Sequence, residues 1–302
     1  MIINEDFYKI PMVSIGMPVF NDKSYLSQAI DSVLNQTFTD FELIISDDGS
    51  TDGSEAICKQ YANNDTRICY IRQPQNLGVS RNMEFLLKQA KGKYFMWAGD
   101  DDILAPTFVE TLIKLLDKNT DAVLAFCPTV FINEFNHPLN SIRTDYSGDT
   151  AFKRIKKLIY QFEDSCGYGL FIREKILNVN FPVWWIFNRK KAFNNIYPTL
   201  CFYLAKGNYV LSPGEPLFYK RREKKNVNHV APFENSLIKG IIALVLWKFN
   251  LVWFSLQQIF KASRSSVLVI RISYLIFWKW FFVPSVKIII DKLSISLKRN
   301  IN

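Results

Sequence analysis

The sequence predicts an α/β fold with a mainly parallel sheet that is covered by helices on both faces. Between residues 13 and 131, short runs rich in β-branched and aromatic residues alternate with segments whose apolar residues recur at helical spacing. The connections between these segments are short, as in strand–helix–strand units. Such sheets bind ligands at the carboxyl ends of their strands, near the point where the strand order reverses.

Five strands and four helices are predicted in this region. The strands are expected over Val13–Val19, Glu42–Ser46, Ile68–Ile71, Tyr94–Trp97 and Ala122–Phe126. The helices are marked by apolar stripes that begin at Leu26, Ala56, Met83 and Phe108. Residues 132–235 are less regular and carry loop signals such as NHPLN and SPGEP.

The positive charge of the chain is concentrated at its C-terminal end. The 302 residues have a net charge of +9, yet residues 221–302 alone carry 14 Lys or Arg and only 3 Asp or Glu. This segment is also apolar and rich in aromatic residues. We therefore expect an α/β domain over residues 1–232 and a basic tail of amphipathic or apolar helices over residues 233–302.

Cysteine and histidine usage excludes several kinds of site. The five cysteines are scattered and have no C-x-x-C spacing, which argues against a disulfide framework or a zinc site and favours a reducing compartment. The two histidines, His137 and His229, are far apart, so an imidazole-rich metal site is excluded and Ser-His chemistry is poorly supported. The N-terminal residues lack the apolar segment of a secretory signal, and we expect the chain to remain in the cytoplasm.

The first polar motif is ELIISDDGSTDGS, in which a predicted strand ends at Asp47 and Asp48. Gly49 allows a tight turn, and Thr51 or Asp52 can cap the helix that follows. A carboxylate at this place can accept hydrogen bonds from a ribose hydroxyl or a base N–H. The alternative is a capped turn whose aspartates are simply solvated.

The second polar motif is KYFMWAGDDDILAP, in which a strand leads directly into Asp100, Asp101 and Asp102. Three consecutive carboxylates repel one another unless a cation lies among them. Hard oxygen ligands favour Mg²⁺ or Mn²⁺, which also coordinate substrate phosphates. A solvated acidic turn is the alternative interpretation.

A third segment, NLGVSRNMEFLLKQAKG, places Arg81 early in a helix after a glycine turn. This position suits contact with a diphosphate. On its own, a single arginine on a helix is more often a surface charge.

These motifs, with VSIGMPVFND before them, resemble the family 2 glycosyltransferases in order and spacing from about Met12 to Pro106. The resemblance implies a GT-A fold, a nucleoside-diphosphate sugar donor and a divalent metal, Mg²⁺ or Mn²⁺. By position, it implies donor contacts from Pro18, Phe20, Asp48, Arg81 and Asp100, and a metal site at Asp101 and Asp102.

The resemblance also implies a role for each of these residues. Pro18 and Phe20 would flank the base, and Asp48 would bind the base or the ribose. Arg81 would lie near the diphosphate. Asp100 would lie against the ribose.

The chain departs from the family pattern at two places. Gly99 stands where the first aspartate of an Asp-x-Asp motif is common, and Asp100 is expected to compensate. The resemblance implies an acidic catalytic base at the two positions that Asn195 and Ile196 occupy in this chain. Neither of these side chains can remove a proton from an acceptor hydroxyl.

The weak candidates for the missing base are Asp102, Asp164 and Glu163. The alternative is that the protein has lost activity and serves as a membrane-associated protein that binds sugar nucleotides. A nucleotidyltransferase is a further rival, but its Gly-rich, basic N-terminal loop is absent from the sequence.

The tail favours contact with a membrane. Its longest uncharged stretch, Phe249–Phe260, has 12 residues, whereas a spanning helix needs about 18 or more. Tryptophans near basic residues are typical of helices that lie in the headgroup region of anionic lipids. The alternatives are helices packed on the catalytic domain and a single imperfect span, and nucleic acid fits poorly because so much aliphatic surface accompanies the charge.

Taken together, we expect an inverting, metal-dependent glycosyltransferase at the cytoplasmic face of the membrane. It would act on a glycan or lipid-linked glycan acceptor, such as an intermediate of a surface polysaccharide. The acceptor is inferred from the membrane location and from no particular residue.

Overall fold

The computed structural model describes residues 10–161, 163–181, 196–222, 251–276 and 279. The predicted α/β region forms β1 (Val13–Val19), α1 (Leu26–Leu34), β2 (Phe41–Asp47), α2 (Ser54–Asn64), β3 (Ile68–Arg72), α3 (Val79–Gln89), β4 (Tyr94–Trp97), α4 (Phe108–Lys118) and β6 (Ala122–Phe126). A short strand, β5 (Ile103–Leu104), lies between β4 and α4. The five predicted strands and four predicted helices are therefore confirmed, and three of the strands have the predicted bounds.

The later part of the chain is more regular than its sequence predicts. It forms β7 (Thr129–Ile132), β8 (Pro138–Ile142), α5 (Ala151–Gln161), the 3₁₀ turn η2 (Ser165–Tyr168), β9 (Leu170–Ile172), α6 (Arg173–Ile176), α7 (Tyr197–Lys206), β10 (Asn208–Leu211) and β11 (Phe218–Arg221). These strands have five residues or fewer, and the loop signals NHPLN and SPGEP lie among them.

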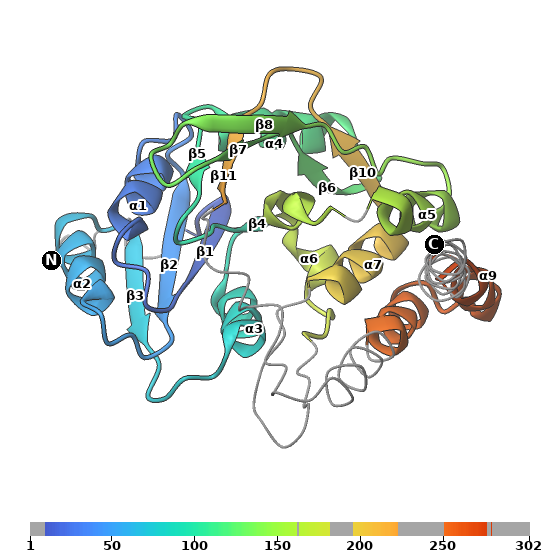
Figure 1. The fold of residues 1–302 in the computed structure, drawn as a ribbon, viewed down its shortest axis with the longest axis horizontal. Helices are drawn as coiled ribbons and strands as arrows, with labels where there is room; N and C mark the ends of the chain where they lie inside the picture. The colour runs from blue at the N-terminus through green and yellow to red at the C-terminus, as the bar shows by residue number, and fades with distance from the viewer. Residues whose placement is uncertain (1–9, 162, 182–195, 223–250, 277–278, 280–302) are drawn as a thin grey trace, which may run out of the picture.

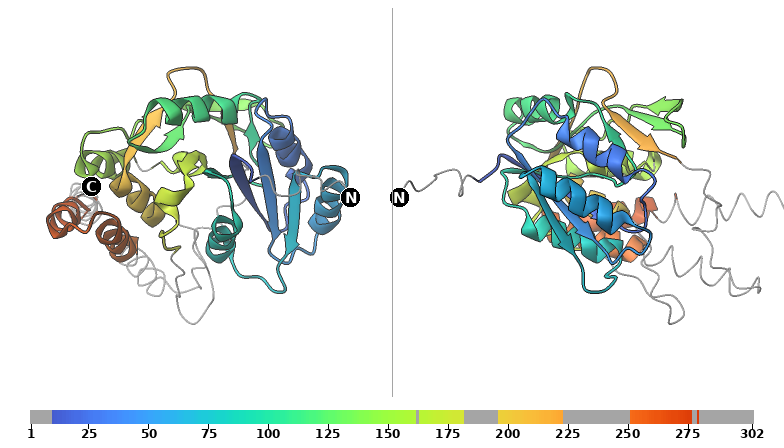
Figure 2. Two further views of the ribbon diagram at one scale, coloured as in Figure 1. Left: turned by 180° about the vertical axis from the view of Figure 1, so that it is seen from behind. Right: turned by 90° about the vertical axis from the view of Figure 1, so that its left-hand side faces the viewer.

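A central seven-stranded sheet has the order β10-β6-β9-β4-β1-β2-β3. Its strands are parallel except β9, which pairs antiparallel with both β4 and β6. In Figure 1, α1 and α2 lie on one side of β1, β2 and β3, and α3 lies on the other. The view from the side in Figure 2 shows α1 and α2 in front of these strands. The expected parallel sheet with helices on both faces is confirmed.

A second sheet of four strands has the order β5-β11-β7-β8. It begins at β5, directly after the acidic motif that follows β4, and it crosses the top of the molecule in Figure 1. The short strand β5 pairs antiparallel with β11, so residues from the distant end of the domain are brought beside the acidic motif.

Aromatic side chains pack in the core around the carboxyl end of β4. Trp97, the last residue of β4, contacts Phe95, Phe171 and Phe181 with ring centroids 4.6–5.7 Å apart in edge-to-face geometry. Such pairs add about 0.5–1.5 kcal/mol each beyond their area burial. These contacts therefore stabilise the carboxyl end of β4.

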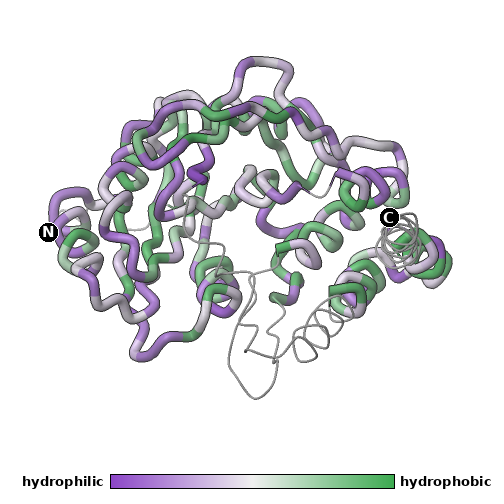
Figure 3. Tube along the Cα trace, viewed as in Figure 1, coloured by the Kyte–Doolittle hydropathy of each residue, from purple (hydrophilic) through white to green (hydrophobic). Residues whose placement is uncertain are grey.

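The described part of the tail packs against the α/β domain. Residues 251–263 and α9 (Ser266–Ile276) are helical, and both are mostly hydrophobic along their length (Figure 3). Gln258 donates to the Asn180 carbonyl at 2.5 Å, and the Arg271 guanidinium lies 4.1 Å from the centre of the Phe152 ring. Packing on the domain, one of the alternatives for the tail, is thus observed for one face of these helices.

Within the described residues, no helix has the length and apolar character needed to cross a membrane. The predicted domain boundary at residues 232 and 233 lies outside the described residues, as do the first residues of the tail. The five cysteines, all within the described ranges, are free thiols as expected.

Candidate active site

The order of strands in the central sheet reverses between β1 and β4. From β1 the chain proceeds outward through β2 and β3, then returns to place β4 on the opposite side of β1. Parallel sheets bind ligands in the crevice at such a switch point, outside the carboxyl ends of the strands. The backbone N–H of Phe20, after β1, donates to Asp100 Oδ2, after β4, at 3.3 Å. Two residues of the predicted donor site are therefore in contact across the switch point.

Two apolar residues, Pro18 and Phe20, lie at the carboxyl end of β1. Pro18 is half-buried and pairs in register with Ser46 of β2, while the Phe20 side chain is 49% exposed. An exposed aromatic ring at the carboxyl edge of a parallel sheet is available to pack against a base. The predicted positions of both residues suit that role.

Asn21 follows Phe20 and is a site residue that sequence reasoning missed. It has a left-handed backbone with φ of 54°, a conformation that asparagine tolerates better than most residues. Its backbone N–H donates to Ser50 Oγ at 3.0 Å, and its Oδ1 accepts from the Thr51 N–H at 2.7 Å. Asn21 thus ties the loop after β1 to the loop after β2.

Asp47 and Asp48, at the end of β2, are both buried. Asp47 accepts hydrogen bonds from the Ser50 N–H at 2.8 Å and from the Arg72 guanidinium at 2.8 Å, so it holds the turn. Asp48 accepts from the backbone N–H groups of Leu77 and Gly78. The alternative of two simply solvated aspartates is therefore wrong.

The Asp48 carboxylate organises the start of α3. Its two oxygens accept the N–H groups of Leu77 at 2.7 Å and Gly78 at 2.9 Å. Burial raises the pKa of Asp48, and these two hydrogen bonds oppose the increase. Gly78 has φ of 81°, and α3 begins at the next residue with Arg81 exposed in its first turn. Asp48 therefore positions the helix terminus that carries Arg81.

The three consecutive aspartates after β4 differ in their surroundings. Asp100 and Asp101 are half-buried, whereas Asp102 is 5% exposed. Burial, followed by the charges of Asp101 and Asp22, raises the pKa of Asp100 well above its usual range. Burial and the neighbouring Asp101 raise the pKa of Asp102 to about 8. Negative charge is therefore costly here, and a cation would relieve it.

Gly99 makes room for the Asp102 side chain. A Cβ atom at residue 99 would lie 2.6 Å from Asp102 Oδ2 and 3.2 Å from Asp101 Oδ1. A side chain at residue 99 would therefore require the Asp102 carboxylate to move from its observed position.

Arg221, the last residue of β11, fixes the acidic segment and was also missed. Its backbone N–H donates to Asp102 Oδ1 at 2.9 Å, and its Nε donates to the Asp101 carbonyl at 2.8 Å. Its guanidinium lies 4.1 Å from the Tyr25 ring centre and donates to the Asn133 carbonyl at 2.8 Å. Arg221 is buried, so both its backbone and its side chain act as internal supports.

The two remaining acidic candidates lie just before η2. Glu163 Oε1 accepts the N–H groups of Asp164 and Ser165 and the Ser165 hydroxyl, so this carboxylate is engaged in the turn. Asp164 accepts from the Lys220 ammonium at 2.7 Å. Of the two positions at which the base was expected, Ile196 is buried and Asn195 lies outside the described residues.

The donor set suits a metal that is shared with a substrate. Among the described residues, no three His, Cys, Asp or Glu side chains converge as a complete metal site. Mg²⁺ and similar ions need only one or two carboxylates when substrate phosphates supply the other oxygens. The half-buried Asp101, beside carboxyls whose pKa values are raised, fits this arrangement.

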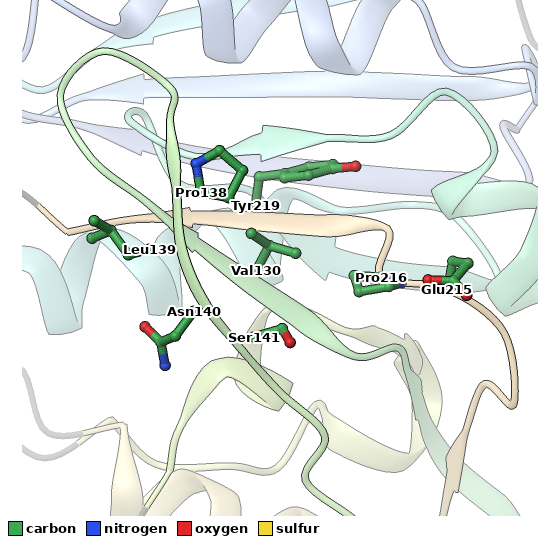
Figure 4. A pocket seen from close by; sticks show the side chains of 8 residues that line it. All are labelled: Val130, Pro138, Leu139, Asn140, Ser141, Glu215, Pro216 and Tyr219. Atoms are coloured by element: carbon green, nitrogen blue, oxygen red, sulfur yellow. The ribbon is translucent and has the colours of Figure 1, made fainter.

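A separate pocket of about 490 Å³ lies on the second sheet (Figure 4). It is lined by Val130, Pro138, Leu139, Asn140, Ser141, Glu215, Pro216 and Tyr219. None of the predicted site residues lines it.

The chain belongs to Glycosyl transferase family 2, whose sequence profile matches residues 14–181. The family resemblance seen in the sequence is thereby confirmed. It is 34% identical over 160 residues to the uncharacterized glycosyltransferase RP339 of Rickettsia prowazekii, covering 52% of this chain and 49% of that protein. It is 28% identical over 170 residues to the minor teichoic acid biosynthesis protein GgaB of Bacillus subtilis, covering 56% of this chain and 19% of that protein. The chain thus spans about half the length, or less, of these relatives.

Two solved structures share the fold. Residues 1–349 of S. aureus TarS in complex with UDP-GlcNAc match with a TM-score of 0.64 and 12% identity, covering 89% of this chain and 73% of that one. The mannosyltransferase PcManGT from Pyrobaculum calidifontis, in complex with GDP-Man and Mn²⁺, matches with a TM-score of 0.55 and 12% identity, covering 96% and 81%. The α/β fold with a mostly parallel central sheet is thereby confirmed as that of known transferases.

Proposed function

We infer that the protein transfers a sugar from a nucleoside-diphosphate sugar to an acceptor hydroxyl, with inversion at the anomeric carbon and with a divalent metal. The observation that carries this inference is the acidic segment Asp100–Asp102 at the switch point, in contact with the loop of Phe20. Both the carboxylates that would bind a metal and the aromatic residue that would pack on the base lie at the edge where ligands of parallel sheets bind.

The donor would lie across the carboxyl ends of β1, β2 and β4. Phe20 and Pro18 would pack against its base, and Asp48 would act by holding the N-terminus of α3 in place. The exposed Arg81 in the first turn of α3 would approach the diphosphate, where the helix terminus also favours negative charge. Asp100 would contact the ribose.

Asp101 would be the main metal ligand, with Asp102 supporting it. The metal, when bound, neutralises the charge that develops on the departing nucleoside diphosphate. Arg221 would keep the Asp101 backbone and the Asp102 carboxylate in their positions. TarS and PcManGT are described in complex with UDP-GlcNAc and with GDP-Man and Mn²⁺, so UDP- and GDP-sugars with Mn²⁺ are the first combinations to test.

We further propose that the protein works at the cytoplasmic face of a membrane on a lipid-linked glycan. The two described helices of the tail each expose apolar residues on one face, namely Trp253 and Phe260 in one and Val267, Ile270 and Tyr274 in the other. These residues recur at spacings of three, four or seven, so they share a helix face. The basic composition of the tail favours anionic lipids, and the role of GgaB in teichoic acid biosynthesis favours a surface glycan as acceptor.

A donor panel tests the proposed function. Wild-type protein is incubated with UDP-, GDP- and dTDP-sugars and a membrane lipid extract, with Mn²⁺ or with EDTA, and the released nucleoside diphosphate is measured. Release with one class of donor, lost in EDTA, is the expected result. Donor binding without release across the panel would instead support the alternative of a sugar-nucleotide-binding protein.

A further inference from the structure

Strand β9 brings η2 to the edge of the sheet at which the acidic segment lies. Because β9 runs antiparallel between β4 and β6, its first residue lies where those two strands end, and Leu170 pairs with Ala125 near the end of β6. The turn η2 directly precedes β9, and Asp164 is its N-cap residue. The topology therefore places the Asp164 backbone on the same edge as Asp100–Asp102.

Two consecutive residues of β11 connect Asp164 to the acidic segment. The Lys220 ammonium donates to Asp164 Oδ1 at 2.7 Å, and the next residue, Arg221, binds Asp102 and the Asp101 carbonyl. Lys220 also lies 5.4 Å from the centre of the Tyr168 ring. Burial raises the pKa of Tyr168 strongly, and the charges of Asp102 and Asp164 add to the increase. The half-buried Tyr168 phenol thus experiences the charges of both carboxylates.

Of the three acidic candidates, Asp164 has a carboxylate that is partly exposed and is not used to hold its own turn. Its side chain is 46% exposed and is held by one lysine, whereas the Glu163 carboxylate caps η2 and the Asp102 carboxylate is buried against the Arg221 N–H. Burial by itself would lower the pKa of Lys220. The ion pair and hydrogen bond with Asp164 outweigh this effect and raise the pKa. Lys220 therefore stays cationic and fixes the direction of the carboxylate.

The start of α7 supplies an apolar wall to this turn. A Cβ atom on Gly167 of η2 would lie 2.3 Å from Ile196 Cδ1, so Ile196 is in direct van der Waals contact with the turn. The Gly167 N–H in turn donates to the Asp164 carbonyl at 2.9 Å. The described residue at which a base was expected therefore adjoins the turn that carries Asp164.

We propose that Asp164 is the catalytic base of the transfer reaction and that Lys220 is its positioning residue, a role that depends on the proposed function above. The acceptor oxygen forms a bond to the anomeric carbon of the donor sugar, and its proton passes to Asp164. The bond between that carbon and the diphosphate oxygen breaks, and its electron pair leaves with the nucleoside diphosphate. Asp164 lies on an element separate from those that would bind the donor, as a base for the incoming acceptor requires.

Asp164→Asn is the decisive variant, and Asp145→Asn is its matched control. Asp145 is also half-exposed and paired with a lysine, Lys157, at 3.0 Å, but it has no place in the proposed site. We expect Asp164→Asn to lower kcat by about 10²- to 10⁴-fold, the range for loss of a general base, with donor affinity within about threefold of wild type. Asp145→Asn should leave both unchanged, and Asp164→Glu should retain part of the rate because it keeps a carboxylate.

The measurement uses the full chain, the donor that wild type consumes, a membrane lipid extract and Mn²⁺. Donor affinity is measured separately by calorimetric titration, which also shows that each variant is folded. If Asp164→Asn retains a kcat within threefold of Asp145→Asn, Asp164 is not the base. If wild type binds donors but releases no nucleoside diphosphate, the proposed function fails and the role of Asp164 fails with it.

Discussion

Single residues far apart in the sequence determine the geometry of the acidic segment. Arg221 holds the Asp102 carboxylate through its backbone N–H and the Asp101 carbonyl through its Nε, while the face of its guanidinium stacks on Tyr25. Gly99 leaves the space into which the Asp102 carboxylate turns. Each of these two residues can be changed without removing a carboxylate.

Arg221→Lys is expected to weaken Mn²⁺ binding by about tenfold or more in the presence of the donor diphosphate, because residues that orient metal ligands usually contribute 10- to 100-fold. Lysine keeps the charge but loses the planar fork that binds the Asn133 carbonyl and stacks on Tyr25. The control is Arg222→Lys, an exposed neighbour. Equal Mn²⁺ affinity in the two variants, measured by calorimetry, would contradict the role given to Arg221.

Gly99→Ala is expected to destabilise the fold by about 1–3 kcal/mol, the usual cost of inserting an atom into a filled site. The added Cβ would overlap Asp102 Oδ2. Gly214→Ala is the control, because a Cβ atom at residue 214 would lie 3.8 Å from the nearest atom. Urea denaturation measures the free energy of unfolding of each variant. A difference below about 0.5 kcal/mol between the two variants would show that the Asp102 side chain can move to accommodate the added Cβ atom.

The sequence predicted those site residues that occur in local motifs. Asp48 and Asp100–Asp102 follow apolar strands directly, so their place at the sheet edge could be derived from the strand pattern. Arg221 and Asn21 gave no such signal, because each acts through contacts made only in the folded chain. The structural use of Asp48 as an anchor for α3 was also beyond prediction, since it depends on a turn 29 residues later in the chain.

At the scale of elements, the strands of the region in which strands and helices alternate were predicted well, and the strands after residue 126 were not. The bounds of β1, β4 and β6 agree with the prediction, and each of these strands is buried along almost its whole length. In contrast, β9 has three residues, and its antiparallel insertion is decided by pairing with β4 and β6. It is this strand that directs η2 and Asp164 to the site.

The connection between β2 and α3 can be tested at the same scale. Asp48→Asn is expected to lower the free energy of unfolding by about 1–3 kcal/mol, because an amide offers one acceptor oxygen where two buried N–H groups now each have one. Asp149→Asn, whose side chain is 68% exposed, is the control. Equal urea midpoints for the two variants would show that the start of α3 does not depend on Asp48.

At the scale of the whole molecule, charge and apolar surface coincide in the tail. One face of the described tail helices packs on the domain, while Trp253 and Ile270 lie on exposed faces. The basic residues of the same segment account for the positive net charge of the chain. This combination supports the proposed contact with anionic lipid.

A double variant, Trp253→Ser with Ile270→Ser, is expected to weaken binding to vesicles of phosphatidylglycerol and phosphatidylcholine by at least tenfold. Each large apolar side chain that enters the lipid contributes about 1.5–3 kcal/mol. Phe135→Ser is the control, because Phe135 is 69% exposed but lies between β7 and β8, away from the tail. Sedimentation with vesicles measures the affinity for lipid. An equal loss of affinity in the double variant and in Phe135→Ser would contradict a membrane-facing tail.

The most direct test of the central claim is the rate of nucleoside diphosphate release by Asp101→Ala, measured with Mn²⁺ and the donor that wild type consumes. Asp149→Ala, an exposed aspartate outside the site, is measured beside it. If the acidic segment carries the transfer through a metal, release by Asp101→Ala falls by at least 100-fold while Asp149→Ala retains the wild-type rate. Equal rates in the two variants would show that the transfer occurs without Asp101 and that the active site lies elsewhere.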